Sequence, residues 1–192
     1  MNIVDLSIIV LIMFFTSFYI KEQFTEVSRV RSTVDNNEYL VRNEKDNKEA
    51  ANLLAKINIK LLKLIDVLKK EHPEDERTKR VIKNYDPTAL SESDESNKYT
   101  SYSVNKGEQI VFCLRMRNAN NTLVDENTLT YVAIHELGHL VTKEIGHLDV
   151  FWSNFKWLLK IATEHGIYKY VDYSQNPQPY CGLVISSNIL NN

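Results

Sequence analysis

The sequence lacks an excess of positive charge. Its 192 residues include 23 lysines and arginines and 25 aspartates and glutamates, which gives a net charge of −2. Neither a basic tail nor a basic patch is visible, whereas proteins that bind nucleic acid usually carry one. We therefore expect no nucleic-acid partner. With 43% hydrophobic and 25% charged residues, the composition is typical of a globular chain with room for one domain and an appendage.

Cysteine is also scarce, since Cys113 and Cys181 are the only two in the chain. So few cysteines agree with a reducing compartment, although the pair could also form one bridge. The distance between two sulfur atoms in the fold does not follow from their separation in sequence, so both states stay open at this point.

The beginning of the chain lacks both a basic region and a small-x-small cleavage site ahead of Lys21. These absences argue against a cleaved signal peptide. An apolar run from Ile3 to Ile20 is present instead, and Asp5 is its single charge. About 18 helical residues are close to the minimum that spans a bilayer core of ~30 Å. We expect a transmembrane anchor over residues 1–20 that contacts the membrane through residues 3–20, with a buried core helix as the alternative.

The residues that flank this run indicate an orientation. Lys21, Arg29 and Arg31 follow it, and no lysine or arginine precedes it. Because positively charged flanks tend to remain on the cytosolic side, we expect a single-pass membrane protein with the rest of the chain in the cytosol. Residues 21–45 are polar and mixed in charge, which is typical of a stalk.

Residues 46–192 show the patterns of a mainly helical α+β domain. Apolar residues three or four positions apart predict an amphipathic helix from Asp46 to Glu71, which Pro73 ends. Two segments rich in β-branched and aromatic residues, Tyr99 to Val104 and Ile110 to Leu114, predict a β-hairpin. A second amphipathic helix with an aromatic stripe begins at Asp149. We therefore expect an α+β fold with a small hairpin or sheet.

The most informative motif is His135-Glu136-Leu137-Gly138-His139, a His-Glu-x-x-His pattern. Histidines four residues apart on a helix project from the same face, so both can reach one metal ion. Glu136 is adjacent to the first histidine, where a carboxylate can reach a metal-bound water without being a ligand. The flanking residues are too apolar for a solvated helix, so these side chains need partners once buried. The motif predicts a Zn²⁺ site with His135 and His139 as ligands and Glu136 as the catalytic residue.

A catalytic zinc normally has three protein ligands and one open position. His147 is the best candidate for the third ligand, but a continuous helix would carry it about 12 Å beyond His139. The helix must therefore end early, and the chain must turn back near Gly146. Glu164, on the next predicted helix, is the rival, because sites with two histidines and a later glutamate are also common.

The motif and the segment Gly146-His147-Leu148-Asp149-Val150-Phe151-Trp152 together resemble the zincin metallopeptidases. Within them the chain is most similar to the WLM and SprT-like group, in which a third histidine and an aromatic-rich helix follow the motif. Here the gap before the third histidine is longer, and Leu148 separates His147 from Asp149. The tyrosine-rich run from Gly166 to Gly182 also resembles small membrane-anchored proteins of large DNA viruses.

This resemblance implies a membrane-anchored zinc metalloendopeptidase that acts on a peptide or protein substrate. It further suggests that Ile110 to Leu114 is the sheet edge that aligns an extended substrate. Three further residues are secondary candidates for the site. Asp149 could cap its helix or orient a ligand histidine, and Tyr173 or Tyr180 could stabilise an oxyanion.

Two other functions follow from the same resemblance. In the first, a catalytically degenerate zincin keeps its metal as a structural staple and binds a partner, but such a site would not need Glu136. In the second, the protein repairs proteins crosslinked to nucleic acid. The acidic balance of the chain and its apolar N-terminal run argue against this second function.

Overall fold

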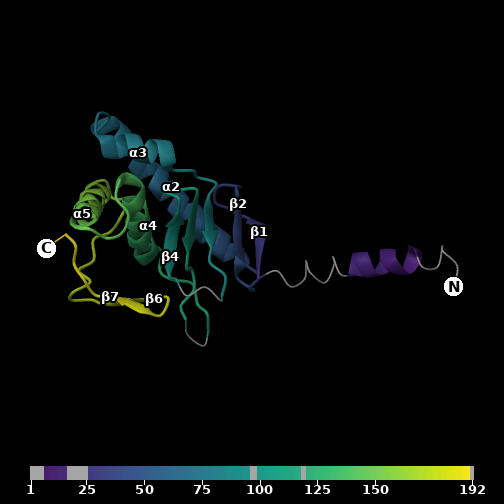
Figure 1. The fold of residues 1–192 in the computed structure, drawn as a ribbon. Coiled ribbons are helices and arrows are strands. Elements are labelled where there is room, and N and C mark those ends of the chain that lie inside the picture. The colour runs from purple at the N-terminus through teal and green to yellow at the C-terminus, as the bar shows by residue number, and fades with distance from the viewer. Residues whose placement is uncertain (1–6, 17–25, 96–98, 118–119, 191–192) are drawn as a thin grey trace.

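A five-stranded sheet forms one layer of the protein. The computed structural model describes residues 7–16, 26–95, 99–117 and 120–190, and its main sheet has the strand order β1-β2-β3-β5-β4 (Figure 1). β2, β3 and β5 run parallel to one another, while β1 and β4 pair antiparallel at the two edges. The predicted hairpin is confirmed as β4 and β5. The strands are β1 (Val27–Arg31), β2 (Glu38–Arg42), β3 (Leu90–Glu92), β4 (Ser101–Val104) and β5 (Gln109–Phe112).

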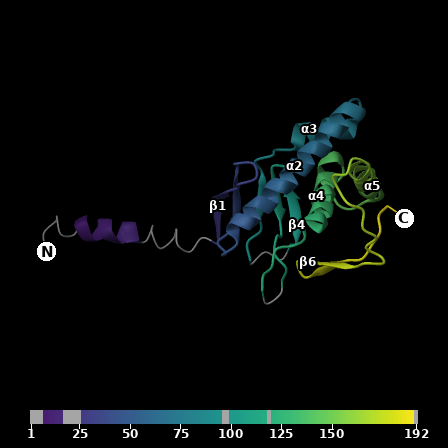
Figure 2. The same ribbon diagram turned by 180° about the vertical axis from the view of Figure 1, so that it is seen from behind.

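Helices α2 (Asn47–Glu71) and α4 (Glu126–Val141) lie against the same face of this sheet (Figure 2). α3 (Glu76–Asn84) contacts both of them, and α5 (Asp149–Glu164) packs on α4. A separate hairpin of β6 (Gln178–Tyr180) and β7 (Leu183–Ile185) follows. The α+β class is confirmed, as is the amphipathic helix predicted from Asp46 to Glu71. The apolar positions that give the helix its predicted inner face are all buried, namely Leu53, Leu54, Ile57, Leu61, Leu64, Ile65 and Leu68.

The prediction of an N-terminal transmembrane helix is wrong. Among the residues that the structure describes, no helix combines the length and the apolar character that crossing a membrane requires. The described part of the N-terminal helix, residues 7–16, rises about 15 Å, or half of a bilayer core. Residues 1–6 and 17–20 of the predicted anchor lie outside the described residues. The predicted single-pass membrane localisation and the membrane partner are corrected with it.

Two strands of the sheet lie within the segment predicted as a stalk. β1 and β2 form a hairpin, and β2 buries Tyr39 and Val41 in the core that α2 also lines. In a strand, alternate residues face the core, so a segment that is polar on average can still have a buried face. The folded domain therefore begins before residue 46, while residues 21–25 lie outside the described part of the chain.

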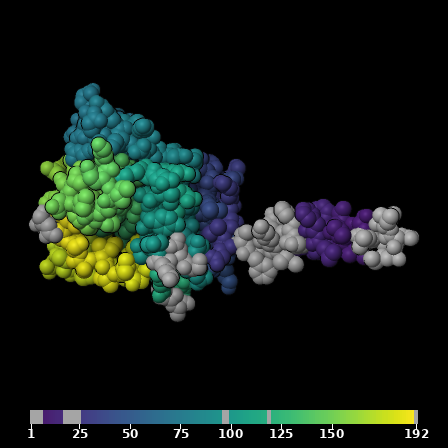
Figure 3. Space-filling view, viewed as in Figure 1, coloured from purple at the N-terminus to yellow at the C-terminus, as the bar shows by residue number. Residues whose placement is uncertain are grey.

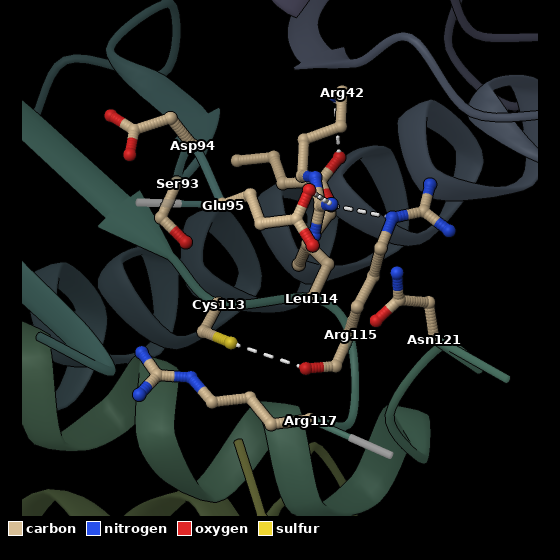
Figure 4. Close-up of a pocket in the computed structure, with 10 residues that line it drawn as sticks. Arg42, Ser93, Asp94, Glu95, Cys113, Leu114, Arg115, Arg117 and Asn121 are labelled. Atoms are coloured by element: carbon tan, nitrogen blue, oxygen red, sulfur yellow. Dashed lines mark hydrogen bonds and ion pairs between the residues drawn. The ribbon is translucent and has the colours of Figure 1, made fainter. Parts of the chain in front are cut away.

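A buried charged cluster ties the ends of three strands to the start of α2. Arg115 is 3% exposed and donates from Nε to Glu92 Oε1 at 2.8 Å and from Nη1 to Asp46 Oδ1 at 2.5 Å. The backbone N–H of Arg42 donates to the other oxygen of Glu92 at 2.8 Å. The cluster borders a cavity of about 300 Å³ (Figure 4). Burial raises the pKa of Glu92, while its hydrogen bonds and its charge interactions with Arg42 and Arg115 act in the opposite direction and favour the ionised carboxylate.

The two cysteines form a disulfide bond. Cys113 follows β5 directly, and Cys181 lies between β6 and β7, 68 residues later. Next to the bridge, the Tyr180 hydroxyl donates to the Cys113 carbonyl at 3.0 Å and lies 2.6 Å from Ser101 Oγ. The bridge therefore fastens the C-terminal hairpin to the sheet, and of the two states that the sequence left open the disulfide is the one observed.

Candidate metal centre

Helix α4 is a fixed platform for the predicted metal ligands. Its N-terminus is capped by Asp125, whose carboxylate accepts a hydrogen bond from Thr128 N at 2.8 Å. Its interior side chains Leu129, Ala133 and Leu137 are fully buried between the sheet, α2 and α5. A helix packed on two sides cannot rotate, so the directions of its histidines are set by the core. The predicted apolar surroundings of the motif are confirmed.

The fold brings His135, His139 and His147 together. α4 ends at Val141, and Gly146, with φ of 87°, turns the chain back toward the helix. His147 Nε2 then lies 2.9 Å from His135 Nε2. One ring nitrogen from each of the three histidines lies within 4.8 Å of the others, which could hold a metal ion. The early helix end and the turn at Gly146 were both predicted.

The protonation states of His135 and His139 are those that favour binding of a metal cation. Burial, together with the neighbouring histidines, lowers the pKa of His135 to about 3 and that of His139 to about 4, so both rings are neutral at pH 7. Neutral imidazoles have free lone pairs for a metal. Burial raises the pKa of Glu136 to about 8.

Glu136 adds an independent sign that a group belongs here. The residue is 3% exposed, and its Oε2 has no hydrogen-bond partner among the described residues. Buried polar atoms in native proteins nearly always have a partner. An orphaned carboxylate oxygen in the same cavity as three imidazoles is therefore the arrangement that zinc with a coordinated water would complete.

A cavity of about 380 Å³ opens over these residues. β4 forms one wall through Ser101, Tyr102 and Ser103, and residues 145–147 form the opposite wall. β4 is the edge of the sheet, whereas β5 lies between β3 and β4. The expectation that Ile110 to Leu114 forms the edge is therefore wrong. β3 was not predicted, because it has only three residues and the serines and acidic residues around it are typical of a loop.

Aromatic rings of α5 pack against the rings of the three histidines. Phe151 is fully buried and stacks on His139 with ring centroids 4.4 Å apart, and its ring also lies 4.8 Å from His135 and 4.6 Å from His147. Trp152 stacks on His147 at 5.5 Å. The predicted role of the aromatic stripe in core packing is confirmed for Phe151, and Phe155 is likewise buried.

The remaining candidates lie elsewhere. Glu164, the rival ligand, ends α5 with a side chain 56% exposed and 3.9 Å from Lys160. Asp149 is exposed in the first turn of α5, and the described residues give it no hydrogen bond to a histidine. Tyr173 is buried against Tyr131, with ring centroids 4.9 Å apart.

Tyr180 is turned toward the disulfide, and neither it nor Tyr173 lines the cavity. Lys106, in contrast, lines the cavity and was not singled out from the sequence, because nothing in the local pattern distinguishes it from other turn lysines.

Comparison with known proteins gives the chain a family. No protein-family model matches it. The chain is 36% identical to protein R325 of Acanthamoeba polyphaga mimivirus over 193 residues, which cover 98% of this chain and 96% of R325. The chain belongs to the R325 family. R325 is uncharacterized, so membership of the R325 family does not by itself assign an activity.

Shorter likenesses extend to other viruses. The chain is 35% identical over 69 residues to the uncharacterized protein 136R of Invertebrate iridescent virus 6 and 38% identical over 68 residues to 042R of Invertebrate iridescent virus 3. Each match covers 35% of this R325-family chain, and 38% and 42% of the two relatives.

Among solved structures, the crystal structure of Wss1 from Saccharomyces cerevisiae is similar, with a TM-score of 0.47 and 23% identity. The match covers 66% of this chain and 89% of Wss1. A likeness at this level does not decide the fold or the activity of the R325 family. The function has to come from the residues around the three histidines.

Proposed function

We propose that this R325-family protein is a zinc-dependent metallopeptidase that hydrolyses peptide bonds in polypeptide substrates. One observation carries the proposal. Three imidazoles with ring nitrogens within 4.8 Å of one another lie beside Glu136, whose buried Oε2 lacks a partner among the described residues. Three nitrogen ligands with an open fourth position are the donor set of a catalytic zinc, not that of a closed structural site.

His135, His139 and His147 would hold the metal through one ring nitrogen each. Bound zinc supplies two things, polarisation of the scissile carbonyl and a lower pKa, near 7, for a coordinated water. The two helix ligands are set in place by the core around α4, and Phe151 packs against all three rings. Fixed ring positions reduce the reorganisation that binding and reaction require.

Glu136 would act as the general base. Its carboxylate would accept the proton of the attacking water and then deliver it to the departing amine. In the metal-free protein its pKa is about 8 because the group is buried. A zinc ion bound by the histidines would favour the ionised carboxylate of Glu136 and lower its pKa. The base would then be available near neutral pH.

β4 would align the substrate. It is an edge strand that borders the cavity, and within the described part of the chain only β5 pairs with it. An extended polypeptide can add to such an edge through backbone hydrogen bonds, which give affinity without demanding a particular sequence. Selectivity would then come from side chains at the cavity walls, among them Tyr102 and Ile145.

Metal content and peptidase activity of the full chain test the proposal. The parent protein should carry one zinc per chain by mass spectrometry and should cleave a fluorogenic peptide library. Glu136→Gln should keep the zinc and lose about 10²–10⁴-fold in kcat, the usual contribution of general acid–base catalysis. Glu49→Gln, at an exposed position in the first turn of α2, is the matched control and should change neither quantity.

Two results would contradict the peptidase. If the parent binds no zinc, the proposal fails at its first step. If the parent holds zinc but neither the library nor unfolded casein is cleaved, the chain is better described by the alternative of a degenerate zincin that uses its metal as a staple in a binding protein.

A further inference from the structure

The third ligand lies on a segment that the core does not hold. Residues 143–150 are all exposed, including Ile145 at 88% and Leu148 at 56%. The segment is anchored at its two ends, by Thr142 at the end of α4 and by Phe151 in α5, which are 1% and 0% exposed. Burial of apolar side chains therefore does not fix the path between these anchors, although His147 lies in the middle of it.

The anchor at Thr142 is a well-satisfied helix end. Thr142 N and Oγ1 both donate to the Gly138 carbonyl, and Asn154 Nδ2 donates to Thr142 Oγ1 at 2.9 Å. Arg80 Nε donates to the carbonyl of Val141 at 2.6 Å. These contacts end before Lys143, so they fix the helix terminus and do not reach the backbone of residues 143–147.

Lys106 supplies the support. This residue belongs to the turn between β4 and β5, and its ammonium donates to the carbonyls of Thr142 and Glu144, each at 2.6 Å. Among the described residues, no other hydrogen bond from outside reaches the backbone of residues 143–147. The β4–β5 turn and the segment after α4 lie side by side on one face of the molecule (Figure 3). Charged donors to the free carbonyls at a helix end are among the stronger hydrogen bonds.

The backbone of the turn is itself held in an unusual conformation. Lys106 has φ of 60° and Asn105 has φ of 46°, in the left-handed region that residues with a Cβ atom rarely adopt. At the next position, a Cβ added to Gly107 would lie 2.3 Å from the Asn84 carbonyl oxygen, so the turn is pressed against the end of α3. A glycine at position 106 would suit this backbone better than lysine does. The side chain, not the local conformation, is therefore the reason for a lysine here.

We infer that Lys106 is a positioning residue for the third metal ligand, because it clamps the backbone of residues 142–144 and so holds His147 beside His135 and His139. This inference rests on the proposed function. It concerns the affinity for metal, since an unclamped His147 would have to be ordered each time the metal binds.

Zinc affinity of the full chain, measured by competition with a chromophoric chelator, tests the inference. Lys106→Met and Lys106→Gly should each weaken binding by about 10–100-fold, the usual effect of losing a group that orients a ligand. Lys106→Arg keeps a charged donor and should recover part of the loss. Lys143→Met, at an exposed lysine of the same segment, is the matched control and should bind zinc as the parent does.

Two further measurements separate positioning from a general loss of structure. The midpoint of thermal unfolding without metal should rise or stay unchanged in Lys106→Gly, because glycine relieves the left-handed backbone. In a His147→Ala background, Lys106→Gly should weaken zinc binding no further, since the ligand that it positions is already absent.

The outcomes distinguish this inference from the proposed function. If the parent binds zinc and Lys106→Met and Lys106→Gly bind it equally well, the positioning role is wrong while the peptidase proposal stands. If Lys106→Gly weakens binding just as much in the His147→Ala background, Lys106 acts on the fold or on the helix ligands, and the inference fails. If the parent binds no zinc, both proposals fail.

Discussion

Helix α4 and the segment that follows it each contribute to one cluster of histidines but are built in opposite ways. α4 is buried on two sides, and its histidines His135 and His139 are neutral because of that burial. The segment 143–150 is exposed throughout, and its ligand His147 depends on a turn, on stacked rings and on Lys106. The proposed metal site would therefore join one half that the core positions with an exposed half that a turn, ring stacking and a few polar contacts position.

Phe151, where the exposed segment returns to the core, gives the largest expected effect. Phe151→Ala should reduce the free energy of unfolding of the metal-free protein by about 3–5 kcal/mol, because a fully buried ring is removed and a cavity is left. Leu148→Ala, at a position 56% exposed, should change it by less than about 0.5 kcal/mol. Urea unfolding measures both, and equal effects would contradict the division between core and exposed segment.

The helix ligands should matter more for zinc than the segment ligand does. Zinc sites with four protein ligands bind with about 10–16 kcal/mol, or about 2.5–4 kcal/mol per ligand. His135→Ala should therefore weaken binding by several hundredfold. His147→Ala should cost less, because ordering the exposed segment offsets part of what its ligand contributes. Chelator competition gives both constants, and a larger loss in His147→Ala would reverse the comparison.

The pH dependence of the free energy of unfolding tests the burial of Glu136 on α4. A carboxyl whose pKa rises from 4.5 to about 8 on folding favours the protonated state, so its contribution to stability is complete below pH 4.5 and is lost as the pH rises toward 8. Metal-free Glu136→Gln should accordingly be more stable than the parent at pH 7, by about 3 kcal/mol. The difference should disappear near pH 4.

Urea unfolding in the presence of a chelator follows this difference. Both proteins share the histidine titrations, which act in the opposite direction and cancel in the comparison. A parent that is as stable as Glu136→Gln at pH 7 would show that the carboxylate has a partner that the structure does not reveal.

The smallest effect is expected at Glu164. Its side chain is 56% exposed and 3.9 Å from Lys160, so Glu164→Ala should change stability by less than about 0.5 kcal/mol and leave zinc affinity unchanged. The same chelator competition serves as the measurement. A loss of zinc in this variant would restore Glu164 as the third ligand in place of His147.

Local patterns predicted the helical part of the site well. The four-residue spacing of His135 and His139, the apolar flanks of α4 and the turn at Gly146 all depend on neighbours in sequence, and the structure has them. The N-terminal run shows the limit of such reasoning. Its hydrophobicity suggested a span, but apolar composition does not fix helix length, and the described helix covers only residues 7–16.

The sheet could not be predicted to the same degree. β1 and β2 are hidden in a segment that is polar on average, and β3 has only three residues. Which strand forms the edge depends on β3 pairing with β5, a contact between distant parts of the chain that no local period records. For the same reason the edge beside the cavity is β4 and not β5.

By itself the sequence predicted two metal ligands on one helix, a general base between them and a third histidine on a chain that turns back toward the helix. A helical repeat places side chains by short-range geometry, so spacing alone is enough. Only the tertiary structure decided how that return is held, through Lys106 from a distant hairpin, and how the C-terminal hairpin is fastened, through Cys113 and Cys181. These contacts join residues that are far apart in the chain, and their partners are chosen by packing of the whole domain.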